Sequence, residues 1–149
     1  MKNNFIFANR AEGKTEFLIK LANDLAKVGY KVEFYSLTNE TIHPKLNDKI
    51  YYDLLPNNFI NLKYILDVKK QKVKSGKIDF VFIDDIDYLD KWNELIELDC
   101  IKFITIDKNN LDSRNLFSGV HNLFNLKNIE YKNFSNPYLR DKKIDNILS

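Results

Sequence analysis

Hydrophobic residues along the chain follow two spacings in turn, one typical of strands and one typical of helices. A short apolar run at 5–8 predicts a buried strand. Apolar residues from Phe17 to Ala26 recur three and four positions apart, which predicts an amphipathic helix that stops at Gly29. Residues 31–37 alternate and are rich in β-branched and aromatic side chains, so they predict a second strand. A strand, a helix and a strand in this order predict two parallel strands joined by a helical crossover.

The same succession continues toward the C-terminus. Residues 38–56 are irregular, with Pro44 and Pro56 as breakers around a short extended piece at 50–52. The elements expected beyond this stretch are a helix at 59–77 with a lysine-rich end, a strand at 78–83, a helix at 89–96, a strand at 101–106, a short helix or loop at 111–117, strands at 122–126 and 129–134 paired as an antiparallel hairpin, and a charged helical tail. This order predicts an α/β fold with a mainly parallel central sheet flanked by helices.

The composition fits one domain, which we place at 1–137, followed by a charged tail at 138–149. Of the 149 residues, 44% are hydrophobic, yet no apolar run is long enough to span a bilayer. No signal peptide is visible, so we expect a cytoplasmic protein without membrane association. A single cysteine and two histidines give no zinc pattern. The balance of 23 basic against 21 acidic residues is too even to indicate nucleic-acid binding by itself.

The loop after the first predicted strand carries the clearest chemical motif. Its sequence, Ala-Asn-Arg-Ala-Glu-Gly-Lys-Thr, fits the Walker A pattern except that alanine replaces the first glycine. Between a strand and a helix N-terminus, such a loop directs backbone N–H groups at a bound phosphate. We expect Lys14 to contact the β- and γ-phosphates and act in catalysis, and Thr15 to ligate Mg²⁺. The candidate nucleotide-binding residues are Ala8, Asn9, Arg10, Ala11, Glu12, Gly13, Lys14 and Thr15.

A second motif supports the first. The apolar strand Phe-Val-Phe-Ile at 80–83 ends in two carboxylates, which is the Walker B arrangement. Asp84 is placed to hold Mg²⁺ through water, because this ion keeps several waters and takes few carboxylates. Asp85 is a candidate for orienting the attacking water, although an acid after a buried strand is equally consistent with a plain surface position. A simple turn that opens a helix is the alternative interpretation of the whole loop.

A strand normally lies between the Walker A and Walker B strands in this class of fold, and 101–106 is the available candidate. The end of such a strand faces the phosphates. Thr105, Asp107 or Lys108 is therefore a candidate γ-phosphate sensor, and a polar solvent boundary at the strand end is the equally good alternative.

With both motifs placed, the chain resembles the ATPase domain of DnaB-type replicative helicases, a RecA-like family whose P-loop also commonly begins with alanine. The resemblance rests on FIFANRAEGKTEFLIKLANDLAKVGYKVEFYSL, on VFIDD and, more weakly, on Leu-Asp-Ser-Arg at 111–114 with Ser-Gly at 118–119. It implies a RecA-like P-loop NTPase fold, ATP and Mg²⁺ as ligands, and a role in DNA replication or recombination.

Two positions depart from the pattern of that family. Where the family places its water-activating glutamate, this chain has Thr38, and Glu40 is the nearest carboxylate and so a candidate catalytic residue beside Asp85. The segment Lys-Asn-Phe-Ser-Asn-Pro at 132–137 resembles the finger that reaches a neighbouring subunit's nucleotide, but Phe134 stands in place of its arginine. An arginine finger contributes on the order of 10³ to 10⁵ in rate, so we expect weak hydrolysis at most.

Several functions remain open at this point. The leading interpretation is an ATP-binding protein with weak Mg²⁺-dependent ATPase activity, with single-stranded DNA as a further partner and an oligomeric state left open. The second is a non-catalytic module that modulates a replicative helicase or its loader, and the third is an AAA+-type loader with Asp85 as base. A small-molecule kinase ranks last because arginines are few. Lysines at 69–77 could contact a phosphate backbone, though most such runs are solvated helix ends.

Overall fold

The computed structural model describes residues 3–36, 41–55, 59–86, 98–110 and 122–148. The helices and strands in these ranges are, in chain order, β1 (Asn3–Ala8), α1 (Lys14–Lys27), β2 (Val32–Ser36), η1 (His43–Lys45), β3 (Tyr51–Leu54), α2 (Phe59–Lys74), β4 (Phe80–Ile83), β5 (Ile101–Asp107), η3 (Lys108–Asn110), β6 (Asn122–Asn125), η5 (Leu126–Asn128) and α4 (Tyr131–Leu148). The helix expected at 89–96 and the segment expected at 111–117 lie outside the described residues.

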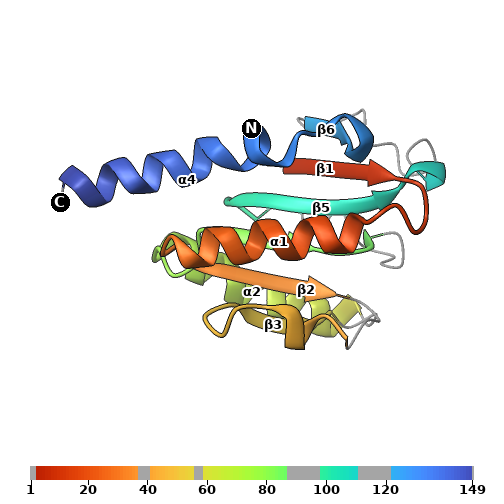
Figure 1. The fold of residues 1–149 in the computed structure, drawn as a ribbon. Coiled ribbons are helices and arrows are strands. Elements are labelled where there is room, and N and C mark those ends of the chain that lie inside the picture. Colours follow the sequence, from red (N-terminus) through yellow and green to blue (C-terminus); the bar gives the residue numbers. More distant parts are fainter. Residues whose placement is uncertain (1–2, 37–40, 56–58, 87–97, 111–121, 149) are drawn as a thin grey trace.

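The six described strands form one sheet in the order β3-β2-β4-β5-β1-β6 (Figure 1), and every pairing between them is parallel. The predicted α/β class with a mainly parallel sheet is therefore confirmed. β5 lies between β1 and β4, as expected for the strand at 101–106. Since all six strands run the same way, the loops after β1, β4 and β5 meet at one edge of the sheet.

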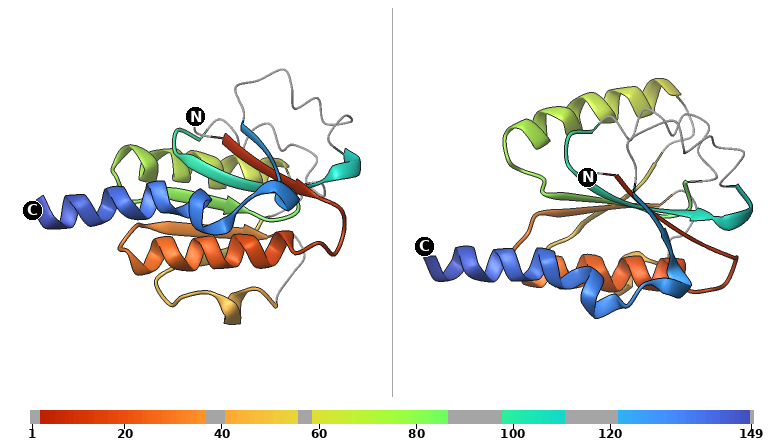
Figure 2. Two further views of the ribbon diagram at one scale, coloured as in Figure 1. Left: turned by 45° about the horizontal axis from the view of Figure 1, so that its top comes forward. Right: turned by 90° about the horizontal axis from the view of Figure 1, so that it is seen from above.

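The helices cover both faces of this sheet, with α2 on one face and α1 and α4 on the other (Figure 2). The topology explains this division. The step from β1 to β2 crosses the sheet in one direction and the step from β3 to β4 crosses back, and right-handed crossovers then place α1 and α2 on opposite faces. The chain is thus a three-layer arrangement with two apolar interiors, one on each side of the sheet.

Aromatic rings fill the interior beneath α1 and α4. Phe34, Phe82 and Phe103 stack side by side across β2, β4 and β5, with ring centroids 5.9 and 5.0 Å apart. Phe134 and Tyr138 of α4 pack edge-on against Phe103, at 5.8 and 5.5 Å. Edge-to-face pairs of this kind contribute about 0.5–1.5 kcal/mol beyond the area they bury. These contacts anchor α4 to the sheet.

The antiparallel hairpin expected at 122–134 is wrong. β6 pairs parallel with β1, and the residues from Tyr131 onward are helical. Tyr131, Phe134 and Tyr138 recur at helical spacing and all face the core, so packing decides for a helix despite Pro137 inside it. The boundary drawn at residue 138 falls within this single helix.

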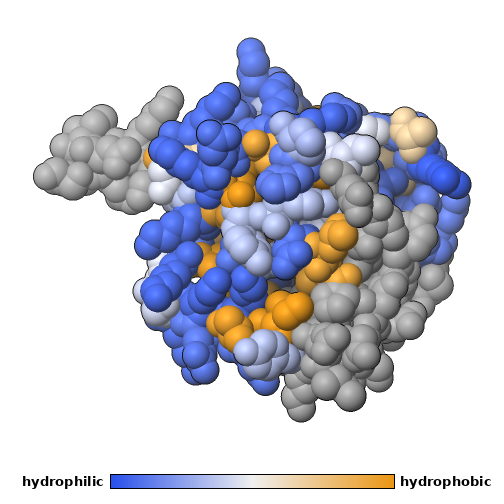
Figure 3. All heavy atoms as spheres, turned by 90° about the horizontal axis from the view of Figure 1, so that it is seen from below, coloured by the Kyte–Doolittle hydropathy of each residue, from blue (hydrophilic) through white to orange (hydrophobic). Residues whose placement is uncertain are grey.

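β3 is one of the two edge strands of the described sheet and is mostly exposed, and it corresponds to the short extended piece predicted at 50–52. Figure 3 shows this face, on which hydrophobic residues interrupt a largely hydrophilic surface. Among the residues whose burial the structure describes, the exposed large hydrophobic side chains belong to β3 and α2, and they are Tyr51, Leu54, Tyr64 and Val68. In the described part of the chain, no helix is both long and apolar enough to cross a bilayer.

Candidate phosphate-binding site

The loop at 9–13 joins β1 to α1 and has a left-handed backbone at two positions. Ala11 has φ 64° and Gly13 has φ 93°. A Cβ on Gly13 would meet no atom within 4 Å, so the backbone conformation rather than space favours glycine there. The first hydrogen bond of α1 runs from the N–H of Phe17 to the carbonyl of Gly13, at 3.0 Å. The N–H groups of the preceding residues lack an intrahelical acceptor and can bind an anion.

Lys14 lies under this loop. Its side chain is almost completely buried, with the residue 7% exposed, and its Nζ donates to the carbonyl oxygens of Ala8 and Asn9, both at 3.2 Å. Ala8, where the Walker A pattern has glycine, is fully buried at the end of β1. The ammonium group is therefore held at the base of the loop, with one of its three hydrogens left over from these two carbonyls.

Asp84 follows β4 and is fully buried, and two threonine hydroxyls hold its carboxylate. Thr15 Oγ1 donates to Oδ2 at 2.8 Å, and Thr105 Oγ1 donates to Oδ1 at 2.7 Å. Because an ionised carboxylate only accepts hydrogen bonds, each hydroxyl must be the donor. Thr15 comes from the first turn of α1 and Thr105 from β5. The three side chains thus connect the N-terminus of α1 to β4 and β5.

Burial raises the pKa of the Asp84 carboxyl above the usual range for aspartate. The hydrogen bonds from Thr105 and Thr15, and the positive charge of Lys14, act in the opposite direction and only partly offset it. A carboxylate in this position is short of positive charge, because its two direct partners are neutral hydroxyls. Donation by Thr15 also leaves the lone pairs of its Oγ1 free to ligate a cation.

Asp85 adopts a conformation that few residues other than glycine tolerate, with φ 54°. Its N–H donates to Thr105 Oγ1 at 2.8 Å, so the same hydroxyl that donates to Asp84 also fixes the next peptide. Asp85 lines a pocket of about 300 Å³ in front of α1. The other residues that line this pocket are Arg10, Ala11, Gly13, Lys14, Thr15 and Glu16.

The remaining two loop residues brace the loop from outside this pocket. The carboxylate of Glu12 accepts from the backbone N–H and the Nδ2 of Asn9, both at 3.1 Å, and it pairs with Lys127 Nζ at 3.2 Å. No local sequence pattern points to Lys127, because its position depends on the pairing of β6 with β1. The brace links the C-terminal third of the chain to the loop.

The structure therefore brings together most of the site residues that were predicted from the sequence and that it describes. Lys14, Thr15 and Asp85 line one pocket. Asp84 and Thr105 are connected to them through hydrogen bonds. Asp107 pairs with Ala8 in the register of β1 and β5, and Lys108 begins η3 at this same edge. Glu40 lies outside the described residues, as do Thr38 and the segments 111–114 and 118–119.

Two other residues that the sequence analysis considers, Phe134 and Lys69, lie elsewhere in the fold. Phe134 is on α4 and packs against Phe17 and Phe124 in the core, with ring centroids 5.6 and 4.9 Å apart. Lys69, the first lysine of the basic run, is buried and pairs with Glu33 at 3.1 Å, so it does not belong to an exposed basic surface. Both side chains stabilise the fold.

Compared with models of known protein families and with curated protein sequences, the chain matches none of them.

Proposed function

We propose that this chain binds a nucleoside triphosphate with Mg²⁺ in a RecA-like P-loop fold, with ATP as the nucleotide, and that it hydrolyses ATP slowly. One observation carries the proposal: the fully buried Asp84 is hydrogen-bonded by Thr15 from the first turn of α1, directly beneath the loop that ends in Gly13 and Lys14. A fully buried carboxylate whose hydrogen-bond partners are both neutral hydroxyls is costly for the fold alone. It is explained by a cationic ligand.

The residues of the loop fit a phosphate group. The N–H groups at the start of α1 and the positive end of its dipole attract an anion, and Lys14 adds a full charge beside the same pocket. A pocket of about 300 Å³ is at the lower end of the usual range for small-ligand sites. This volume is large enough for the phosphate chain of a nucleotide.

The oxygen donors beside the pocket fit Mg²⁺. This ion binds few protein groups, keeps several waters and prefers hydroxyl and carboxylate oxygens. Thr15 Oγ1 would ligate it directly and Asp84 would hold it through water. When bound, the ion supplies positive charge to the phosphate oxygens that bear negative charge during transfer. Thr105 keeps Asp84 in the required orientation.

Asp85 is the described carboxylate best placed to orient an attacking water. It lines the pocket, and its strained backbone is fixed by the hydrogen bond to Thr105. An aspartate reaches less far than a glutamate, which supports slow rather than fast hydrolysis. By resemblance, the cellular role is DNA replication or recombination. The alternative is a non-catalytic module acting on a replicative helicase or its loader. It is favoured by the packing of Phe134 against the core, where that family has its finger.

The test is thermal unfolding with and without Mg²⁺-ATP. A ligand at 100 times its dissociation constant stabilises the fold by about 2.7 kcal/mol, which raises the midpoint by roughly 5–10 °C for a chain of this size. Lys14→Ala should lose most of this shift, because it removes the buried cation at the loop. Lys27→Ala is the matched control, since Lys27 is an exposed lysine at the other end of α1.

The outcomes separate binding from hydrolysis. An unshifted wild-type midpoint, or equal shifts in wild type and Lys14→Ala, would contradict nucleotide binding at this loop. If the wild type shifts but phosphate release stays at background, with or without single-stranded DNA, the chain is a nucleotide-binding module without ATPase activity.

A further inference from the structure

Arg10 is a second cationic side chain at the candidate phosphate-binding site, beside Lys14. It lies in the loop at 9–13, its side chain is exposed, and it lines the pocket together with Lys14, Thr15 and Asp85. Within the residues that the structure describes, its guanidinium makes no hydrogen bond or ion pair. Lys14, by comparison, already donates to two carbonyl groups of the loop. Arg10 therefore has all of its donors available for a ligand in this pocket.

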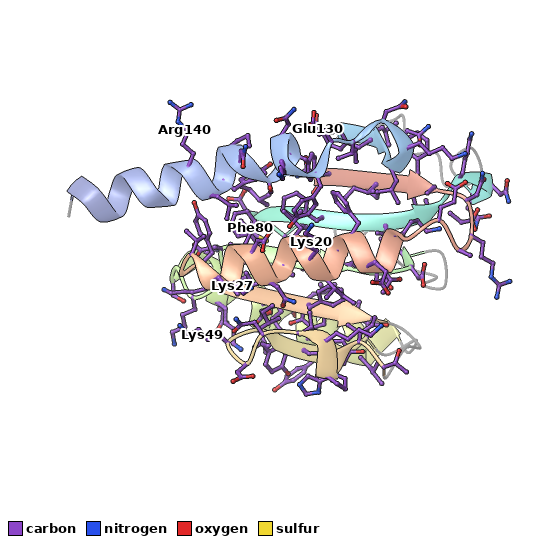
Figure 4. The ribbon with its side chains drawn as sticks, in the orientation of Figure 1. Lys20, Lys27, Lys49, Phe80, Glu130 and Arg140 are labelled. Carbon is purple, nitrogen blue, oxygen red and sulfur yellow. The ribbon has the colours of Figure 1, made fainter. Side chains whose placement is uncertain are left out.

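The other arginines do not compete for this place. Arg140 is on α4 and points away from the sheet, at the end of the molecule remote from the carboxyl ends of the strands (Figure 4). Arg114 lies outside the described residues. The side chain of Phe134 is packed into the core against Phe17, Phe103 and Phe124. In the described part of the chain, Arg10 is thus the arginine that a bound triphosphate would meet.

The geometry points to Arg10 as a catalytic residue that neutralises the terminal phosphate within its own chain. This inference rests on the proposed nucleotide binding. A guanidinium carries five N–H donors in a planar fork that matches two phosphate oxygens, so it is better suited to this contact than a lysine. Asp85, on the other side of the same pocket, is placed to orient the water.

In the reaction, the oxygen of a water molecule forms a bond to the γ-phosphorus, and the bond from the γ-phosphorus to the β,γ-bridging oxygen breaks. The water proton passes to Asp85 or to bulk solvent, and the electron pair leaves with ADP. Negative charge increases on the oxygens around the phosphorus, where the Arg10 guanidinium donates. No residue of a second chain is required, so a single molecule contains every residue that this reaction needs.

Phosphate release from Mg²⁺-ATP tests this inference together with the midpoint shift. Arg10→Ala should keep most of the shift, because Lys14, Thr15 and the loop amides remain, but its turnover should fall by up to about 10³-fold, to background. Arg10→Lys should recover little, since it restores the charge without the fork. Arg140→Ala is the matched control and should keep wild-type turnover. Turnover per molecule should not change when the wild type is diluted.

Each result bears on a different claim. Wild-type turnover in Arg10→Ala would overturn the catalytic role, and so would a loss of the shift as complete as in Lys14→Ala, which would make Arg10 a binding residue only. A turnover per molecule that rises with protein concentration would show that a neighbouring chain completes the site. A wild type that binds ATP without hydrolysing it would also overturn the role of Arg10. An unshifted wild type would instead mark the failure of nucleotide binding itself.

Discussion

Two buried carboxylates lie on or directly after neighbouring strands of the sheet, and they differ in the charge of the groups that contact them. Glu33 of β2 lies beneath α2 and is 6% exposed, and Asp84 follows β4 and is fully buried. Lys69 Nζ contacts Glu33 at 3.1 Å, Lys72 Nζ lies at 3.9 Å, and the hydroxyl of Tyr35 donates to it at 2.5 Å. Glu33 is therefore surrounded by cations that the chain itself supplies.

Asp84 has no such direct partner. Its oxygens are bonded by the hydroxyls of Thr15 and Thr105, while the nearest cation, Lys14, is turned to the carbonyls of its own loop. A neutralised carboxylate such as Glu33 holds elements together, here β2 and α2. A carboxylate held only by neutral donors keeps an unmet attraction for positive charge. The contrast separates a structural ion pair from a site built for a cation.

The largest expected effect comes from breaking the pair around Glu33. Lys69→Met leaves a buried carboxylate with only the more exposed Lys72 nearby, and removal of one partner of a buried pair costs about 3–5 kcal/mol in free energy of unfolding. Urea unfolding measures this loss. The double variant Glu33→Gln/Lys69→Met should recover much of it. A loss no larger than that of Lys74→Met, an exposed lysine on the same helix, would show that the pair is not structural.

The second effect should appear only with ligand. Asp84→Asn replaces a buried carboxylate, whose pKa burial raises, by a neutral group of the same shape. The free energy of unfolding of the unliganded protein should therefore change by about 1 kcal/mol or less. The Mg²⁺-dependent part of the stabilisation by ATP, out of about 2.7 kcal/mol at 100 times the dissociation constant, should disappear. Asp48→Asn, at an exposed position, serves as control. A large loss of stability without ligand would make Asp84 a structural residue like Glu33.

The smallest effect is the contribution of Tyr35, in the Glu33 cluster, to the dependence of stability on alkaline pH. Burial and the Glu33 carboxylate raise the pKa of Tyr35 well above the ordinary value of 10.0. A raised folded-state pKa contributes stability that is complete below the ordinary value and is lost as pH rises above it. By about pH 11 the wild type should lose about 1.4 kcal/mol relative to Tyr35→Phe.

This dependence is measured as the difference in free energy of unfolding between wild type and variant across that pH range. Tyr64→Phe is the control, because Tyr64 is 72% exposed and lies outside the Glu33 cluster. Threonine hydroxyls do not ionise in this range, so Asp84 and its partners should contribute nothing to the difference. A difference that stays constant with pH would mean that Tyr35 is not protected by its surroundings.

Local patterns in the sequence predicted where the main residues of the candidate site lie, for a physical reason. Lys14 and Thr15 are marked by local spacing, Asp84 by its place at the end of an apolar strand, and Thr105 by the strand order that the motifs imply. Each signal lies within a few residues of its element. The structure places all four where these signals put them.

Contacts between distant segments carried no comparable signal. The pairing of Glu33 with Lys69 and of Glu12 with Lys127 joins residues that no local pattern relates. The helical spacing of Tyr131, Phe134 and Tyr138 was present in the sequence, but alternating residues at 129–134 also fit a strand. Only the apolar surface provided by Phe17 and Phe103 decides between the two.

The position of β1 has a consequence for how the protein is made. This strand is synthesised first, yet both of its neighbours in the sheet, β5 and β6, come from the last third of the chain. At roughly 5–20 residues per second, a ribosome takes several seconds to reach them. Non-local parallel pairing of this kind is slow to form. The loop at 9–13 thus leaves the ribosome well before β5 and β6, and it takes its final shape only after these two strands have been made.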